Sequence, residues 1–142
     1  MYKVSLAIPI YNVSLFVERA LLSVLNQTYD NIEYLIVDDK GQDDSMDIVH
    51  RIIKDHPRGK DVRIIEHPYN IGLGATRNTA IDNAQGEYLF FMDSDDEIIP
   101  TCIEILVHKM QEHPVDFIAA SHMKKDLSGK TYPTYTYSPI LI

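Results

Sequence analysis

Short apolar runs alternate along this chain with segments in which apolar residues recur every three or four positions. The runs predict strands at Val4–Ile10, Ile32–Val37, Val62–Glu66, Glu87–Met92 and Asp116–Ser121. The other segments predict helices at Ser14–Gln27, Ser45–Lys54, from the Asn70–Gly74 loop to about Gly86, and from Pro100 onward. Strands that alternate with helices of this length predict a mostly parallel sheet with helices on both faces, a three-layer α/β/α fold.

Several residues are typical of the ends of these elements. Ser14 is a suitable N-cap, Pro100 suits the first turn of a helix, and Gly86 is expected to stop the helix before it. The remainder, residues 124–142, predicts irregular structure or a hairpin that turns at Gly129 and Lys130. We expect residues 1–142 to form a single domain.

Acidic residues follow two of the predicted strands directly. The apolar run that ends at Met92 continues into Asp93-Ser94-Asp95-Asp96-Glu97, and the second strand continues into Asp38-Asp39. Because the carboxyl ends of parallel strands share one edge of the sheet, where ligands bind in such folds, we expect the two sets of acids to converge. Closely spaced carboxylates repel one another unless they share a cation, and Asp93-x-Asp95 suits Mg²⁺ or Mn²⁺.

Composition and charge narrow the choice of function. The 142 residues are 45% hydrophobic and 24% charged, which is ordinary for one globular domain with a real core. A net charge of -8 argues against nucleic acid as a partner. The single cysteine, Cys102, excludes an internal disulfide, and the apolar start is too short for a signal peptide, so we expect a cytoplasmic protein.

The order and spacing of several motifs resemble the inverting, GT-A-type glycosyltransferases of family 2. These motifs are Ile8-Pro9-Ile10-Tyr11-Asn12, Ser23–Tyr29, Glu33–Asp39, Asn70-x-Gly72 followed by Arg77-Asn78, Ala84-x-Gly86-Glu87-Tyr88, and Asp93–Asp96 followed by Pro100. Each motif alone is weak, but the set is specific and spans residues 4–121. The resemblance implies a GT-A fold, a nucleotide-diphosphate sugar donor (most simply a UDP-sugar), Mn²⁺ or Mg²⁺, and a glycan or lipid-linked acceptor.

The same resemblance implies roles for individual residues. Pro9, Tyr11 and Asn12 would border the nucleotide base, and Asp39 would accept a hydrogen bond from it. Asp95 would ligate the metal, and Asp93 would face the ribose or the region where sugar and metal meet. The remaining nucleotide-binding residues would be Asp38, Gly72, Arg77 and Ser94.

The chain departs from the family pattern in the loop after the paired acids, at the helix start Ala75–Ala80, which lacks a frequent Ala before Arg77 and Gly after Asn78, and in length. Lys40-Gly41 follows the paired acids where the family usually has Gly-Ser, which would alter the nucleotide contact. Family members also usually continue well beyond this length. We therefore expect the acceptor site and the general base beyond Ile142, and peripheral attachment to the inner face of the membrane for a longer protein. Apolar surface left uncovered, including Tyr132, Tyr135 and Tyr137, would favour self-association.

Other interpretations remain open at this point. The chain could bind a nucleotide sugar without transferring it. An apolar strand followed by Asp-x-Asp also begins the phosphatases that use an aspartate nucleophile, although Glu97 stands where those enzymes usually have Thr or Val. A calcium loop over Asp93–Glu104 would need glycine in place of Ile98, and an acidic cluster can also be only a solvated loop.

Overall fold

The computed structural model describes residues 1–133, which divide into two compact units, residues 1–103 and residues from 104 onward. The first unit holds a four-stranded sheet in the order β3-β2-β1-β4, and all its neighbouring strands are parallel. Its strands are β1 (Val4–Ile10), β2 (Ile32–Asp38), β3 (Val62–Glu66) and β4 (Tyr88–Phe91). Its helices are α1 (Val17–Leu25), α2 (Ser45–Asp55), the 3-10 helix η1 (Pro57–Asp61) and α3 (Leu73–Asn83).

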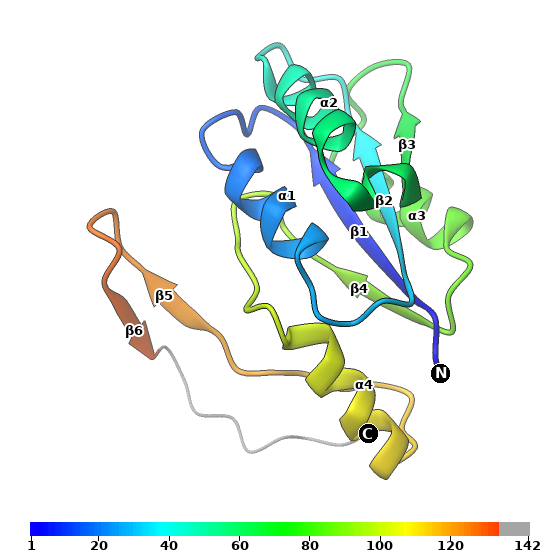
Figure 1. Cartoon of the computed structure of the whole chain (residues 1–142). Coiled ribbons are helices and arrows are strands. Elements are labelled where there is room, and N and C mark those ends of the chain that lie inside the picture. The colour runs from blue at the N-terminus through cyan, green and yellow to red at the C-terminus, as the bar shows by residue number, and fades with distance from the viewer. Residues whose placement is uncertain (134–142) are drawn as a thin grey trace. The chain divides into compact units, whose positions relative to one another are not determined.

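Helices cover both faces of this sheet, which confirms the three-layer prediction. Helices α1 and α2 lie together on one face, and α3 lies on the other (Figure 1). Under α3, the small residue Ala80 packs with Ala7, Leu35 and Val37 of the two central strands. Strand β2 is buried along all seven residues, as expected for a central strand covered on both faces.

Two predicted helix ends differ in the structure. The first helix begins at Val17 rather than Ser14, and no side chain caps it; the backbone N–H of Ser14 instead bonds to Asp43. Helix α3 ends at Asn83, before Gly86. A Cβ atom on Gly86 would lie 2.6 Å from the carbonyl oxygen of Lys3, so this glycine is needed for close contact with the chain at β1 rather than as a helix stop.

The second unit contains most of α4 (Cys102–Glu112) and a two-stranded antiparallel hairpin of β5 (Met123–Lys125) and β6 (Thr131–Pro133). The sequence predicted either irregular structure or a hairpin for this part of the chain, and the structure shows a hairpin. The strand predicted at Asp116–Ser121 is wrong: no strand forms there, and Phe117 is exposed. An apolar run becomes a strand only with a neighbour for its backbone groups, and no strand of the described chain pairs with this run. Tyr135 and Tyr137 lie outside the described residues.

Within residues 1–133, none of the helices is both long enough and apolar enough to cross a lipid bilayer.

Candidate functional site

The carboxyl ends of the strands bring the predicted acidic residues to one edge of the sheet. In the strand register, Ile10 of β1 lies opposite Asp38 of β2, and Asp38 lies opposite Glu66 of β3. On the other side of β1, Asp93–Asp96 follow β4, and the backbone N–H of Met92 donates to the carbonyl of Ala7. Both acidic sets therefore lie at the carboxyl edge, on either side of β1.

The loops after β1 and β2 enclose a hollow of about 210 Å³ at this edge. Its lining contains four residues that the sequence singled out: Tyr11, Asn12, Asp38 and Lys40. The others are Ile10, Gly41, Asp43, Ser45 and Met46. The hollow thus combines an exposed aromatic ring, apolar side chains and charged groups, which is the mixture that binds small polar ligands.

Side chains of each loop hold the backbone of the other. The backbone N–H of Gln42 donates to Oδ1 of Asn12 (2.8 Å), that of Val13 to Oγ of Ser45 (2.9 Å), and that of Ser14 to Oδ2 of Asp43 (2.9 Å). Burial alone would raise the pKa of Asp43, but the hydrogen bonds from Ser45 and Ser14 lower it to about 2. The loops are therefore fixed to each other before any ligand arrives.

Two residues that line the hollow adopt the left-handed backbone conformation without being glycine. Asn12 has φ 50° and Lys40 has φ 55°. Such conformations cost free energy and concentrate at functional sites. Gly41 is required here for space, because a Cβ atom would lie 2.7 Å from Oδ1 of Asn12 and 2.8 Å from its backbone nitrogen.

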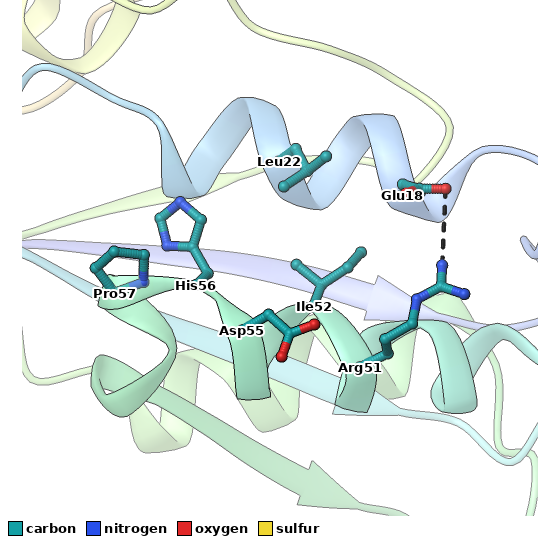
Figure 2. Close-up of a pocket in the computed structure, with 7 residues that line it drawn as sticks. All are labelled: Glu18, Leu22, Arg51, Ile52, Asp55, His56 and Pro57. Atoms are coloured by element: carbon teal, nitrogen blue, oxygen red, sulfur yellow. Dashed lines mark ion pairs between the residues drawn. The ribbon is translucent and has the colours of Figure 1, made fainter.

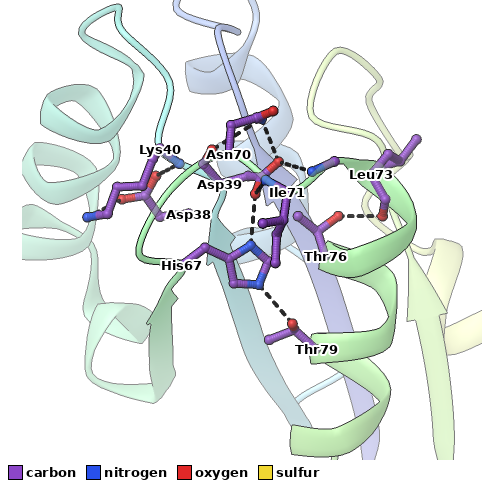
Figure 3. A network of polar contacts seen from close by, with 10 residues as sticks. Asp38, Asp39, Lys40, His67, Asn70, Ile71, Leu73, Thr76 and Thr79 are labelled. Atoms are coloured by element: carbon purple, nitrogen blue, oxygen red, sulfur yellow. Dashed lines mark hydrogen bonds and ion pairs between the residues drawn. The ribbon is translucent and has the colours of Figure 1, made fainter.

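Asp39 points into the protein, where its carboxylate organises the loop after β3 (Figure 3). Its side chain is only 2% exposed. Oδ1 accepts hydrogen bonds from Nδ1 of His67 (2.8 Å) and the N–H of Ile71 (2.9 Å), and Oδ2 accepts from Nδ2 of Asn70 (2.7 Å) and the N–H of Gly72 (3.0 Å). Burial alone would raise the pKa of Asp39, yet the hydrogen bonds from His67, Ile71 and Gly72 lower it.

The four hydrogen bonds use the accepting capacity of the Asp39 carboxylate. A contact from Asp39 to a nucleotide base therefore stays a prediction, one that would require a protein donor to be displaced. Asp38 is the member of the acidic pair that lines the hollow. The sequence could not show that Asp38 faces the hollow while Asp39 faces the protein interior. Those directions depend on how the end of β2 packs against the loop at Asn70.

His67 is a site residue that the sequence did not assign. Because a carboxylate can only accept, Nδ1 of His67 donates to Asp39, and Nε2 then faces Oγ1 of Thr79 at 2.8 Å. In the neutral ring, Nε2 accepts the hydroxyl proton of Thr79. His67 thus connects the paired acids to α3, the helix that carries Arg77. A lone histidine after a strand gives no sequence signal for such a contact.

The acids after β4 form a cluster that could hold a metal ion. Asp93, Asp95 and Asp96 each offer a carboxylate oxygen, and these oxygens lie within 4.8 Å of one another. An all-oxygen, all-carboxylate set suits a hard divalent cation such as Mg²⁺ or Mn²⁺, so these residues fit the ion that the sequence predicts. Asp96 is an addition to the predicted pair.

The remaining predicted site residues lie beside this cluster, in the loop before α3 or within β1. Nη2 of Arg77 lies 3.5 Å from Oδ1 of Asp93, and Ser94 is buried between the exposed acids. Gly72 has φ 96°, with open space around its Cα, so its backbone conformation requires glycine. Pro9 lies inside β1 opposite Val37. The structure thus places Pro9 on the strand below the hollow and Arg77 beside the acids.

A second hollow, of about 250 Å³, lies between α1 and α2 (Figure 2). Glu18 and Arg51 form an ion pair at one end (3.8 Å), and His56 and Pro57 lie at the other. None of the site residues predicted from the sequence lines it. It therefore adds nothing to the chemistry at the sheet edge.

Comparisons with known proteins agree with this fold and site. Residues 5–140 match the family model of glycosyl transferase family 2, so the chain belongs to that family. It is 33% identical over 135 residues to an uncharacterized glycosyltransferase of Haemophilus influenzae, covering 95% of this chain and 53% of that protein. It is 31% identical to the GalNAc(5)-diNAcBac-PP-undecaprenol beta-1,3-glucosyltransferase of Campylobacter jejuni, covering 92% of this chain and 43% of that protein.

Solved structures show the same GT-A fold. TarS of S. aureus in complex with UDP-GlcNAc superimposes with a TM-score of 0.78 and 27% identity, over 93% of this chain and 37% of that chain. The mannosyltransferase PcManGT of Pyrobaculum calidifontis gives a TM-score of 0.73 at 24% identity, over 80% of this chain and 34% of that chain. The chain thus spans about half or less of the length of the relatives that it matches.

Proposed function

We propose that these residues form the donor-binding part of a glycosyltransferase. The enzyme would move a sugar from a nucleoside diphosphate to an acceptor hydroxyl and invert the configuration of the anomeric carbon. The observation that carries this proposal is the position of the hollow and the acids on one edge of one sheet. The hollow after β1 and β2 suits a base and ribose, and the acids after β4 suit a cation and a diphosphate.

The residues around the hollow would bind and orient the nucleoside. The Tyr11 ring is partly exposed and offers a surface for stacking, while Asn12 is held in place by the N–H of Gln42. Asp38 can accept a hydrogen bond from a base N–H. Asp39, through His67 and Asn70, would fix the loop that leads to α3, and its predicted contact with the base would displace one of these donors.

Asp93 and Asp95, joined by Asp96, would hold Mn²⁺ or Mg²⁺. The bound cation would supply Lewis-acid stabilisation of the negative charge on the departing diphosphate. The guanidinium of Arg77, now 3.5 Å from Asp93, is close enough to turn to a phosphate oxygen. These groups hold the donor while an acceptor oxygen attacks the anomeric carbon from the opposite side, which inverts that centre.

The attack requires a base to take the acceptor's proton. We propose that this base and the acceptor site lie beyond Ile142, and that the acceptor is a glycan or a lipid-linked glycan of a cell-surface polysaccharide pathway. The name of the C. jejuni relative, which includes an undecaprenol carrier, supports the lipid-linked choice. Self-association of this chain stays a prediction that light scattering can check.

A second candidate is a binding module that holds the nucleotide sugar without transferring it. It is favoured for residues 1–142 alone because this chain covers only 53% and 43% of the two relatives named above. Family membership, by contrast, removes the reason to consider an aspartate-nucleophile phosphatase.

Calorimetry with UDP, with and without Mn²⁺, tests the shared part of both candidates. We expect binding that requires the cation. An assay for UDP release from UDP-sugars in the presence of glycan acceptors then separates transfer from binding alone. Equal affinity in the presence of a chelator, or no affinity for any nucleoside diphosphate, would overturn the proposal.

A further inference from the structure

We propose that Gln27 is a positioning residue of the donor site: its buried carboxamide fixes the segment after Asp93–Asp96 and so holds those acids at a spacing that binds the cation. This inference rests on the proposed function, because the cation is part of it. Gln27 belongs to the motif Ser23–Tyr29, to which the sequence assigned no role.

The segment between β4 and α4 has no regular secondary structure. Strand β4 ends at Phe91 and α4 begins at Cys102, and the residues between them form neither helix nor strand. Before the acids, the N–H of Met92 still donates to the carbonyl of Ala7 in β1 (2.9 Å). After the acids the backbone leaves the sheet, so its polar groups need partners from elsewhere in the fold.

The side chain of Gln27 supplies such partners. Nε2 donates to the carbonyl of Ile99 (2.8 Å) and to that of Ser23 (3.0 Å), and Oε1 accepts from the N–H of Ile103 (3.0 Å). Both amide hydrogens are therefore used, and Gln27 is only 2% exposed. A buried carboxamide with these partners is fixed in one orientation, and it fixes the segment in turn.

Two neighbours of Gln27 extend the contact toward the acids. The N–H of Thr28 donates to the carbonyl of Pro100 (2.8 Å). Oγ of Ser23, one turn earlier in α1, accepts from the N–H of Ile98 at 3.3 Å. The contacts made by the motif thus reach to within two residues of Asp96.

The motif is itself held firmly by the rest of the first unit. The carbonyl of Gln27 accepts from Nη1 of Arg58 in η1 (2.8 Å), and Nη2 of that guanidinium lies 2.6 Å from Oδ1 of Asp30. Helix α1 buries one apolar face, which consists of Val17, Ala20, Leu21, Val24 and Leu25. Gln27 is therefore fixed through its backbone while its side chain holds the segment.

The spacing of the acids depends on both ends of this segment. Asp93, Asp95 and Asp96 bring carboxylate oxygens within 4.8 Å of one another, and their mutual repulsion favours spreading when no cation is bound. A segment held on both sides keeps the carboxylates close, so its conformational freedom is lost in folding rather than in cation binding. Release at Gln27 should lower the affinity for the cation without removing a ligand.

Gln27→Met is the direct test, because methionine keeps an unbranched side chain of similar size and removes the three hydrogen bonds. Ser23→Ala is a milder variant that removes only the acceptor of the Ile98 N–H from this segment. The matched control is Ser5→Ala. Ser5 is also buried, and it accepts from the N–H of Gly86 (2.8 Å), but it lies at the amino end of β1, the opposite edge of the sheet.

Mn²⁺ affinity is measured by electron paramagnetic resonance of free Mn²⁺, at a temperature where thermal unfolding shows every variant to be folded. Gln27→Met should weaken Mn²⁺ binding by about 5- to 10-fold and Ser23→Ala by about 2- to 3-fold. Ser5→Ala should unfold at a lower temperature yet bind Mn²⁺ as the wild type does. The rise in unfolding temperature on addition of Mn²⁺ should follow the same order.

Wild-type affinity in folded Gln27→Met, or an equal loss in Gln27→Met and Ser5→Ala, would reduce Gln27 to a structural role. Either result overturns the inference and leaves the proposed function standing. If Gln27→Met does not fold, Ser23→Ala decides, and wild-type affinity in that variant overturns the inference. A wild type that binds no Mn²⁺, alone or with UDP, would overturn the cation part of the proposed function and the inference with it.

Discussion

Nδ1 of His67 lies 2.8 Å from Oδ1 of Asp39, so a histidine at the end of one strand fixes the acid at the end of its neighbour. The backbone supports the same contact, because the N–H of His67 donates to the carbonyl of Asp38 (2.9 Å). Asp39 in turn receives the N–H groups of Ile71 and Gly72, which start the loop before α3. The ends of β2 and β3 are thus joined to the loop before α3 through the carboxylate of Asp39.

Removal of this carboxylate should be among the most destabilising single changes in the chain. Asp39→Ala leaves the ring N–H of His67 and the backbone N–H groups of Ile71 and Gly72 without their acceptor, while Nδ2 of Asn70 keeps only its bond to the carbonyl of residue 39. We expect the free energy of unfolding to fall by about 2–4 kcal/mol in urea denaturation. Asp61→Ala removes an exposed acid and should change it by less than about 0.5 kcal/mol. Similar losses for both variants would contradict the structural role of Asp39.

Acid should weaken the contact between the loops after β1 and β2, because one of its three hydrogen bonds goes to the Asp43 carboxylate. The pKa of Asp43 is about 2 in the folded chain and 3.8 ordinarily, so its contribution to stability is complete above about pH 4 and is lost as the pH falls toward 2. Asp43→Asn should therefore be less stable than the wild type at neutral pH, and the difference should shrink below pH 3. Urea denaturation across this range measures it, and a difference independent of pH would refute the assignment.

The acids after β4 should bind Mn²⁺ in the absence of nucleotide. Asp95→Ala removes one of the three clustered carboxylates, and we expect Mn²⁺ affinity to fall by about tenfold or more. Titration followed by electron paramagnetic resonance of free Mn²⁺ gives this value without any assay of transfer. Asp82→Ala, on the exposed side of α3, should leave the affinity unchanged; an equal loss in both would mean that the ion binds through general surface charge.

Two glycines should respond in opposite directions to the same substitution. Gly86→Ala forces a methyl group to within 2.6 Å of the Lys3 carbonyl and 2.7 Å of the Ser5 nitrogen, so we expect a loss of about 1–3 kcal/mol in unfolding free energy. Gly74→Ala adds a methyl group to open space within α3 and should gain about 0.5–1 kcal/mol. Thermal or urea unfolding checks both, and a stabilised Gly86→Ala variant would contradict the close approach of the chain to β1.

The sequence predicted the sheet well because its signals are local. Runs such as Tyr34–Val37 are buried on both faces and apolar throughout, and the helices between the strands carry a three-to-four residue period. The prediction was wrong at Asp116–Ser121, where the composition suits a strand but the described chain supplies no partner. Gly86 was misassigned because its limiting contact is with residues more than 80 positions earlier in the sequence.

The candidate site was predicted in outline but not in its internal contacts. The sequence placed acids at two strand ends, and parallel pairing brought them to one edge. It could not show that Asp39 faces inward, that His67 holds it, or that Lys40 reaches both Asp38 and Glu66. Those contacts depend on the register of β2 against β3, which relates residues about 28 positions apart and leaves no short motif.

The three bonds that fasten the loop after β1 to the loop after β2 also affect how a ligand would bind. Neither wall of the hollow can move outward without breaking hydrogen bonds to Asn12, Asp43 or Ser45. The conformational entropy of these walls is therefore lost during folding rather than during association. A nucleoside would enter a receptor of fixed shape, so its affinity would report on direct complementarity to the side chains of the hollow, with little heat or entropy from loop ordering.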